Sequence, residues 1–209
     1  MKNIHRFLLL AVFAGGTLLI SSCDKEDDGL QLIAHDDSVF MRNMHEGMAT
    51  MEAMMLTQDP DHDFSSMMIM HHEIAIKNSE EELRIGTSSE MKAMAQSIVD
   101  AQMAEIEEFN AFLAGHPARE PLVPEFTTLQ MMNMIQMSKG VDLRPLTGNP
   151  DLDFAALMID HHQAAIENSV ALLTFGREEQ TKEIARRIIA DQKVEIRMLQ
   201  DYLLANKTY

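Results

Sequence analysis

The sequence predicts an all-α protein: a four-helix bundle made of two repeated helical hairpins, with two additional short methionine-rich helices. Two observations predict this fold. The chain repeats itself at an offset of 90 residues, with 21 identities in 54 ungapped positions between residues 60–113 and 150–203. Apolar residues recur at helical spacing in both copies. A repeat that keeps every helix in phase indicates a duplicated structural unit.

Each repeat is expected to contain two helices. The first helix should begin at an aspartate N-cap and end at a glycine in the left-handed conformation; these residues are Asp63 and Gly86 in one repeat, and Asp153 and Gly176 in the other. The second helix is expected over about 89–114 and about 179–206. The short linker between the two helices makes them antiparallel.

The two hairpins are separated by a long connection, residues 115–150. It contains prolines and glycines around one short helix predicted near 128–138. A long crossover between two helical hairpins is typical of the ferritin-like topology. A matching methionine-rich helix is expected at about 38–56. We therefore expect residues 38–206 to form one ferritin-like domain.

The first residues have the pattern of an export signal. Two basic residues precede a short apolar run, and Ile20-Ser21-Ser22-Cys23 resembles a bacterial lipobox. Residues 1–22 are thus predicted to be a lipoprotein signal peptide, Cys23 a lipidated membrane anchor, and residues 23–37 an acidic flexible tether. This predicts a lipoprotein of the bacterial cell envelope, facing the periplasm or the surface. An ordinary signal peptide with an incidental cysteine is the alternative.

Composition excludes several classes of protein. The chain has 17 basic and 33 acidic residues, a formal net charge of −16, which argues against nucleic acid as a partner. Its single cysteine cannot form an internal disulfide or a cysteine-based metal site. The 19 methionines among 209 residues are the unusual feature.

Both repeats carry a methionine followed one turn later by two histidines, in the middle of a predicted helix. These residues are Met68, His71 and His72, and their repeats Met158, His161 and His162. Residues at i, i+3 and i+4 lie on one side of a helix, so a thioether and two imidazoles come together. We expect His72 and His162 to point inward, and His71 and His161 to lie nearer the edge of the bundle.

Polar residues on the second helix of each repeat face the same interior: Gln102 and Glu105, and their repeats Gln192 and Glu195. A buried carboxylate needs a partner, and the inward histidine of the same repeat is the obvious one. Three roles fit the pairs His72–Glu105 and His162–Glu195. The glutamate forms a structural polar pair, orients a metal-bound histidine, or binds metal itself.

The two short helices supply further candidate ligands: Met44, His45 and Met48 in the first helix, and Met134 in the crossover helix. Thioether and imidazole suit Cu(I), and Cu(II) at the histidine-rich end. Methionine and histidine are also the soft ligands left to an exported protein, because thiolates oxidise outside the cytoplasm. The alternative is that the methionines only fill an irregular core.

The repeated pattern Asp-x-Asp-Phe-x-x-x-Met-x-x-His-His-x-x-Ala-Ile, followed by Gln-x-x-Glu-Ile, resembles the CopM-like copper metallochaperones, a ferritin-like domain of unknown function (family 305). The resemblance implies an exported helical bundle that binds copper and limits copper toxicity. It implies metal ligation by the methionine and two histidines of each repeat, supported by the short helices. A metallochaperone would exchange copper with another envelope protein.

Two other functions compete with copper sequestration or delivery. One is a metal-free helical surface or scaffold lipoprotein. The other is a di-iron or di-manganese oxidase, which needs more inward carboxylates and a Glu-x-x-His pattern that the paired histidines lack. With no catalytic constellation in the sequence, we expect a binding protein rather than an enzyme.

Overall fold

The computed structural model describes residues 32–206; the predicted signal peptide and Cys23 lie outside the described residues. Within this part of the chain all regular structure is helical, as predicted, apart from an isolated bridge between Ile33 and Leu146. After the short 3-10 helix η1 (His35–Asp37) come six α-helices: α1 (Val39–Glu52), α2 (Pro60–Ile85), α3 (Ser89–Gly115), α4 (Pro124–Asp142), α5 (Pro150–Phe175) and α6 (Glu179–Asn206).

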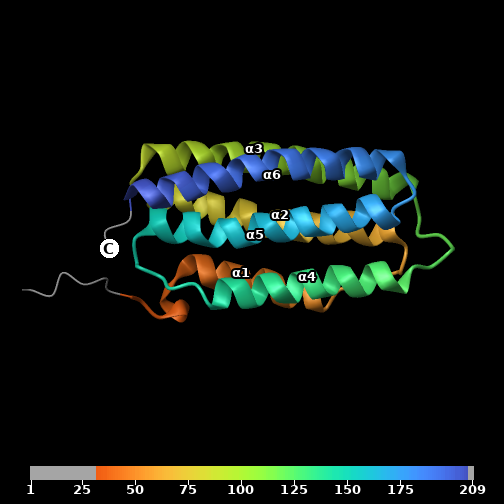
Figure 1. Cartoon of the computed structure of the whole chain (residues 1–209), viewed down its shortest axis with the longest axis horizontal. Coiled ribbons are helices and arrows are strands. Elements are labelled where there is room, and N and C mark those ends of the chain that lie inside the picture. Colours follow the sequence, from red (N-terminus) through yellow and green to blue (C-terminus); the bar gives the residue numbers. More distant parts are fainter. Residues whose placement is uncertain (1–31, 207–209) are drawn as a thin grey trace, which may run out of the picture.

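The helices form three layers of two (Figure 1). Helices α3 and α6 make one outer layer, α2 and α5 the middle layer, and α1 and α4 the other outer layer. Helices α2, α3, α5 and α6 are the predicted four-helix frame. The two methionine-rich helices cover the opposite side of α2 and α5, so the middle layer is enclosed from both sides.

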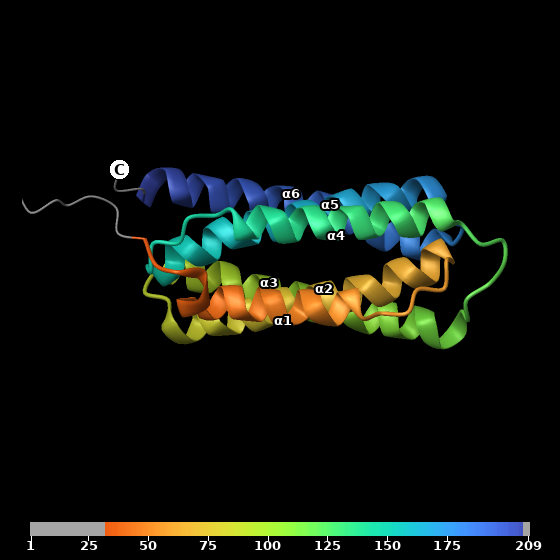
Figure 2. The same cartoon turned by 90° about the horizontal axis from the view of Figure 1, so that it is seen from below.

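The repeat comprises three helices rather than the predicted two. Helices α2 and α5 begin and end at an offset of 90 residues, and α1 and α4 end at the same offset. The amide of Asn43 in α1 donates to Asn78 in α2 at 3.0 Å, and Asn133 donates to Asn168 in the second repeat at the same distance. Figure 2 shows the two three-helix units in opposite halves of the molecule.

The two repeats clamp each other through aspartates at the starts of α2 and α5. The Asp61 carboxylate accepts from the backbone of Arg177 at 2.8 Å and from the Thr181 hydroxyl at 2.6 Å, at the start of α6. The Asp151 carboxylate accepts from the backbone of Ser88 at 2.8 Å, at the start of α3. Each repeat therefore supplies acceptors for backbone N–H groups that precede a helix of the other repeat.

The predicted helix caps were wrong by one turn. Helix α2 begins at Pro60 with Asp59 as its N-cap, and Asn149 caps α5. The carboxylate of Asp63 instead accepts from the Thr57 backbone and hydroxyl, both at 2.7 Å, which fixes the incoming loop. Proline suits the first helical position because its fixed φ is already helical and it has no N–H to satisfy.

The glycines that end α2 and α5 are extended, not left-handed as predicted. Gly86 has φ −58° and ψ 154°, and Gly176 has φ −65° and ψ 155°. Space explains their presence, since a Cβ on Gly86 would lie 2.6 Å from the backbone oxygen of Glu82. At Gly176 a Cβ would lie 2.7 Å from the backbone oxygen of Leu172.

The packed region begins before residue 38. Ile33 donates its backbone N–H to Leu146 at 2.9 Å, and His35 Nε2 lies 2.9 Å from the Arg144 carbonyl. The last residues of the predicted tether therefore lie against the second repeat. Within residues 32–206, no helix has the length and hydropathy required to cross a bilayer.

Candidate metal centre

The rings of His71 and His161 stack at the centre of the molecule. Their centroids are 3.7 Å apart with an interplanar angle of 30°, and both side chains are fully buried. Burial in the middle layer, followed by the charges of neighbouring histidines, holds the pKa of each ring well below its usual value. Both imidazoles are therefore neutral at pH 7 and keep a nitrogen lone pair for a metal ion.

The predicted position of these two histidines was wrong. Taken as one helix, α2 places His71 about 100° from the inward stripe, which suggested the edge of a bundle. The structure places α5 against that flank of α2, so His71 and His161 meet between the two repeats. The side of α2 that lies at the edge of its own hairpin is therefore buried against the other repeat.

His72 and His162 point toward the α3/α6 layer, as predicted. His72 Nε2 lies 2.8 Å from Oε2 of Glu105, and His162 Nε2 lies 3.2 Å from Oε2 of Glu195. Both rings are fully buried, and the two carboxylates are only slightly exposed. The contacts are short enough for ion pairs, but the ring N–H directions do not meet hydrogen-bond geometry. The predicted His–Glu contacts are confirmed.

Buried polar atoms without partners gather around these rings. Within residues 32–206, both nitrogens of His71 and Nδ1 of His72, His161 and His162 have no hydrogen-bond partner. Among these four rings, one hydrogen bond is present in the described part of the chain: Nε2 of His161 lies 3.1 Å from the backbone carbonyl of His71. Unpaired buried polar groups are costly and rare in native proteins. A cluster of them in one place indicates a site that a ligand completes.

A methionine-rich core extends through all three layers. Ten methionines belong to one buried cluster with Phe40, Ile74 and Phe154: Met41, Met44, Met48, Met51, Met67, Met91, Met94, Met134, Met137 and Met158. Met68 is also buried but packs in a second cluster, with Phe64 and Phe109. Six of the ten sulfur atoms come from α1 and α4, two from α2 and α5, and two from α3, and all ten side chains are buried.

His45 does not join the predicted ligands. It lies on the outer face of α1, where its Nε2 is 2.8 Å from Oδ1 of Asp142 in α4, with about half of each side chain exposed. Its neighbours Met44 and Met48 point the other way, into the core. The structure therefore separates the predicted Met44–His45–Met48 group into a buried thioether pair and a surface ion pair.

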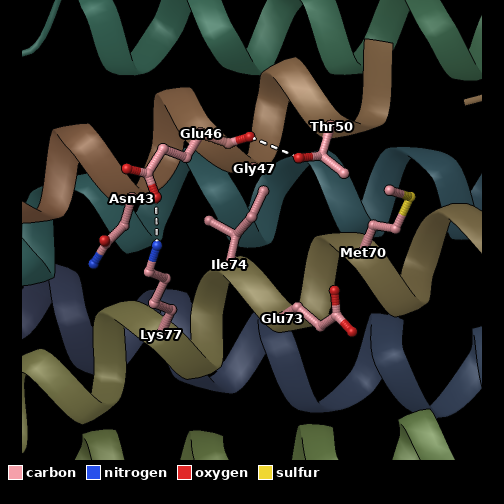
Figure 3. A pocket seen from close by; sticks show the side chains of 8 residues that line it. All are labelled: Asn43, Glu46, Gly47, Thr50, Met70, Glu73, Ile74 and Lys77. Carbon is pink, nitrogen blue, oxygen red and sulfur yellow. Dashed lines mark hydrogen bonds and ion pairs between the residues drawn. The ribbon is translucent and has the colours of Figure 1, made fainter. Parts of the chain in front are cut away.

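Two repeat-related grooves open beside the outer helices. The groove between α1 and α2 has a volume of about 200 Å³. Nζ of Lys77 lies 2.5 Å from Oε2 of Glu46 across this groove, and Figure 3 shows the pair. The groove between α4 and α5 has about 140 Å³ and is lined by the same eight repeat positions. Neither groove is lined by one of the predicted ligands.

No three side chains of histidine, cysteine, aspartate or glutamate within residues 32–206 are arranged to hold a metal ion. Imidazole and thioether, the donor groups of the predicted ligands, suit copper rather than Mg²⁺ or Ca²⁺. Met67, a buried methionine four residues before His71, joins the sulfur cluster although it was not among the predicted ligands. Its helical spacing from His71 was the available signal.

Comparison with known proteins gives a family and a fold. The family described as "Domain of unknown function (DUF305)" matches residues 24–113 and 115–203. A comparison with curated proteins found no match. Both matched segments include one α-helical repeat with its pair of histidines.

Three solved structures resemble the chain. A DUF305 fragment from Deinococcus radiodurans has a TM-score of 0.52 and 25% identity, and the match covers 69% of this chain and 95% of that one. A candidate secreted DUF305 protein from Streptomyces coelicolor has a TM-score of 0.57 and 20% identity, over 72% and 94%. CopM in its Cu(II)-bound form has a TM-score of 0.55 and 26% identity, over 69% and 96%.

Proposed function

The chain belongs to the DUF305 family, and from that premise we propose that it is an exported copper-binding protein. It sequesters or delivers copper through methionine and histidine ligands and so contributes to copper tolerance. Cu(I) is the preferred ion and Cu(II) the second. The similarity to CopM in its Cu(II)-bound form supports this assignment.

The observation that carries the proposal is the stacked pair His71 and His161. Both rings are buried, their pKa values are lowered, and three of their four nitrogens have no hydrogen-bond partner among residues 32–206. Neutral imidazole is the form that binds metal. The adjoining sulfur cluster adds a soft ligand that selects Cu(I) over harder cations.

The cell envelope is the proposed location. The lipobox-like Cys23 supports a lipid anchor there, and a copper-accepting or copper-donating envelope protein would be the partner of a delivery function. Outside the cytoplasm thiols oxidise, so a site made of thioethers and imidazoles suits this location.

Competition for Cu(I) tests the proposal. The purified full chain is titrated with Cu(I) against a chromogenic chelator, beside the variant His71→Phe/His161→Phe, which keeps an aromatic stack but removes the nitrogens. We expect the variant to bind Cu(I) at least tenfold more weakly. The matched control, His35→Ala/His116→Ala, removes two histidines outside the centre and should bind as the wild type does. Equal binding by all three proteins contradicts the proposal.

A second pair of variants tests the sulfur ligands. Met44→Leu and Met134→Leu replace a thioether by an apolar group of similar volume, a change that usually costs less than about 1.5 kcal/mol of stability. We expect weaker Cu(I) binding with the fold retained. Met103→Leu, at an exposed position in α3, is the control.

The competing function is a metal-free scaffold, which the close packing of the buried methionines favours. Thermal unfolding separates the two, because a ligand that binds only the native state must raise the melting temperature. A copper-binding protein should melt at a higher temperature with Cu(I), and a scaffold should not change. The oxidase alternative lacks support, since no group of three metal-binding side chains of the required kind converges within residues 32–206.

A further inference from the structure

The outer layer formed by α3 and α6 connects the buried histidines to solvent. His72 is fully buried, whereas the side chain of Glu105, 2.8 Å away, is 11% exposed. The second repeat has the same arrangement, with the side chain of Glu195 15% exposed beside His162. Each carboxylate therefore touches a buried ring at one end and solvent at the other.

Unpartnered polar atoms mark this layer as well as the histidines. Within residues 32–206, Nε2 of His72 and of His162 point at the carboxylates without a hydrogen bond. Both amide atoms of Gln102 and the amide oxygen of Gln192 are buried without a partner. Buried groups of this kind are satisfied when an ion or its water molecules bind among them.

A third carboxylate, Asp191, joins the two glutamates. It lies one turn before Glu195 on α6 and is exposed. Desolvation, then the charge of Glu105, then that of Glu195 raise its pKa, while the nearby Arg187 lowers it, so the three carboxylates share one electrostatic field with this guanidinium. The equivalent position of the first repeat is Ala101, so the first repeat has no counterpart of this carboxylate.

The opposite side of the histidines faces an apolar core. Helices α1 and α4 cover it, and the core there consists largely of buried methionines, among them Met44 and Met134. A hydrated cation cannot cross an apolar layer without losing its water. Of the two outer layers, α3/α6 is the one whose carboxylates lie in contact with the buried histidine rings.

We propose that the α3/α6 layer is the loading face of the protein, at which Glu105, Asp191 and Glu195 take a hydrated Cu(II) ion from solvent and pass it to His72 and His162. This inference rests on the proposed copper-binding function. Oxygen and imidazole ligands suit Cu(II) better than thioethers do. Within residues 32–206, no three such side chains are arranged to hold a metal ion by themselves.

Loading kinetics test the inference. The full chain is mixed with Cu(II) in a stopped-flow instrument, and the copper absorbance is followed in wild type and in Glu105→Gln/Asp191→Asn/Glu195→Gln. We expect the loading rate constant to fall by about tenfold or more, since clustered charges raise cation association rates by factors of about 10 to 1,000. The single variant Asp191→Asn, at an exposed position that should not affect folding, is expected to give a smaller fall.

The control removes the same charge elsewhere. Glu52→Gln/Glu73→Gln/Glu125→Gln changes exposed acids on α1, α2 and α4 and should load within about twofold of wild type, because only the long-range field changes. Equal rates in the two triple variants, or a wild-type rate in Asp191→Asn, overturn the loading face while leaving copper binding intact. A wild type that binds no copper at equilibrium refutes the proposed function itself.

Discussion

The rings of His71 and His161 stack with their centroids 3.7 Å apart at the contact between the two repeats. A stack of two imidazolium ions would place two like charges in a dry interior, so the structure requires both rings to be neutral. The same requirement makes them available to a metal ion. The contact between the repeats and the candidate metal centre are therefore one feature.

The first prediction is that acid destabilises the fold through these rings. Their pKa values are lowered in the folded state, so below about pH 6.5 the unfolded chain binds protons that the folded chain does not. The free energy of unfolding should fall as the pH drops through that range. Urea unfolding at several pH values measures it, and His71→Phe/His161→Phe should show a shallower slope. Parallel slopes in the two proteins would refute the assignment.

The second prediction concerns Glu82, a fully buried residue of α2. Burial, then its contact with Asp151, raise the pKa of Glu82 to about 8. Between these two pKa values, the folded state keeps a proton on Glu82 that the unfolded state has released near pH 4.5. This proton uptake stabilises the fold fully below about pH 4.5, and the stabilisation is lost as the pH rises toward 8. Wild type should therefore lose stability between about pH 5 and pH 8 relative to Glu82→Gln, by on the order of 2 kcal/mol.

The two pH effects have opposite signs and occur in different parts of the protein, so paired variants separate them. Glu82→Gln should not change the fall in the free energy of unfolding that protonation of His71 and His161 causes at acid pH. A constant stability difference between wild type and Glu82→Gln across this pH range would show that Glu82 does not take up a proton on folding.

The third prediction concerns the reciprocal clamps between the repeats. Asp61→Asn should lower the free energy of unfolding by about 1–3 kcal/mol, because the carboxylate accepts from the Arg177 backbone and the Thr181 hydroxyl at a buried position. Chemical denaturation measures the loss. Asp36→Asn, at an exposed aspartate of η1, is the control, and an equal effect at both positions would argue against the clamp.

Much of this fold could be predicted from the sequence, because the two repeats are most similar in sequence where their side chains are buried. Helices α2 and α5 share their bounds at an offset of 90 residues, and their buried histidines recur with them. The third helix of each repeat was not recognised as part of the duplication. Only three of the 14 positions of α1 are identical in α4, among them the structurally equivalent Asn43 and Asn133.

The candidate site was predicted less completely than the fold. The contact between His72 and Glu105 follows from two helices of one hairpin, and helical periodicity was sufficient to find it. The stack of His71 and His161 depends on how the two hairpins meet, and periodicity within one helix carries no information about that contact. Asp191 was missed for the same reason, since its neighbour Glu105 belongs to the other repeat.

The last prediction rests on a difference between the repeats in the sizes of two packed side chains. Gly47 in α1 lies directly against Ile74 in α2, and a Cβ on Gly47 would lie 2.1 Å from Cγ1 of Ile74. The equivalent residues of the second repeat are Met137 and Ala164, so the large and small side chains have exchanged helices. The close approach of the helices is kept in each case by one small residue.

Gly47→Ala should therefore destabilise the protein by about 1–3 kcal/mol through overpacking, although alanine is the better helix former. In the double variant Gly47→Ala/Ile74→Ala, the smaller side chain at position 74 makes room for the added methyl group, as in the second repeat. Adding Gly47→Ala to Ile74→Ala should therefore cost less stability than adding it to the wild type. A double-mutant cycle from urea unfolding measures the coupling between the two positions. Additive effects would show that Ile74 is not what requires glycine at position 47.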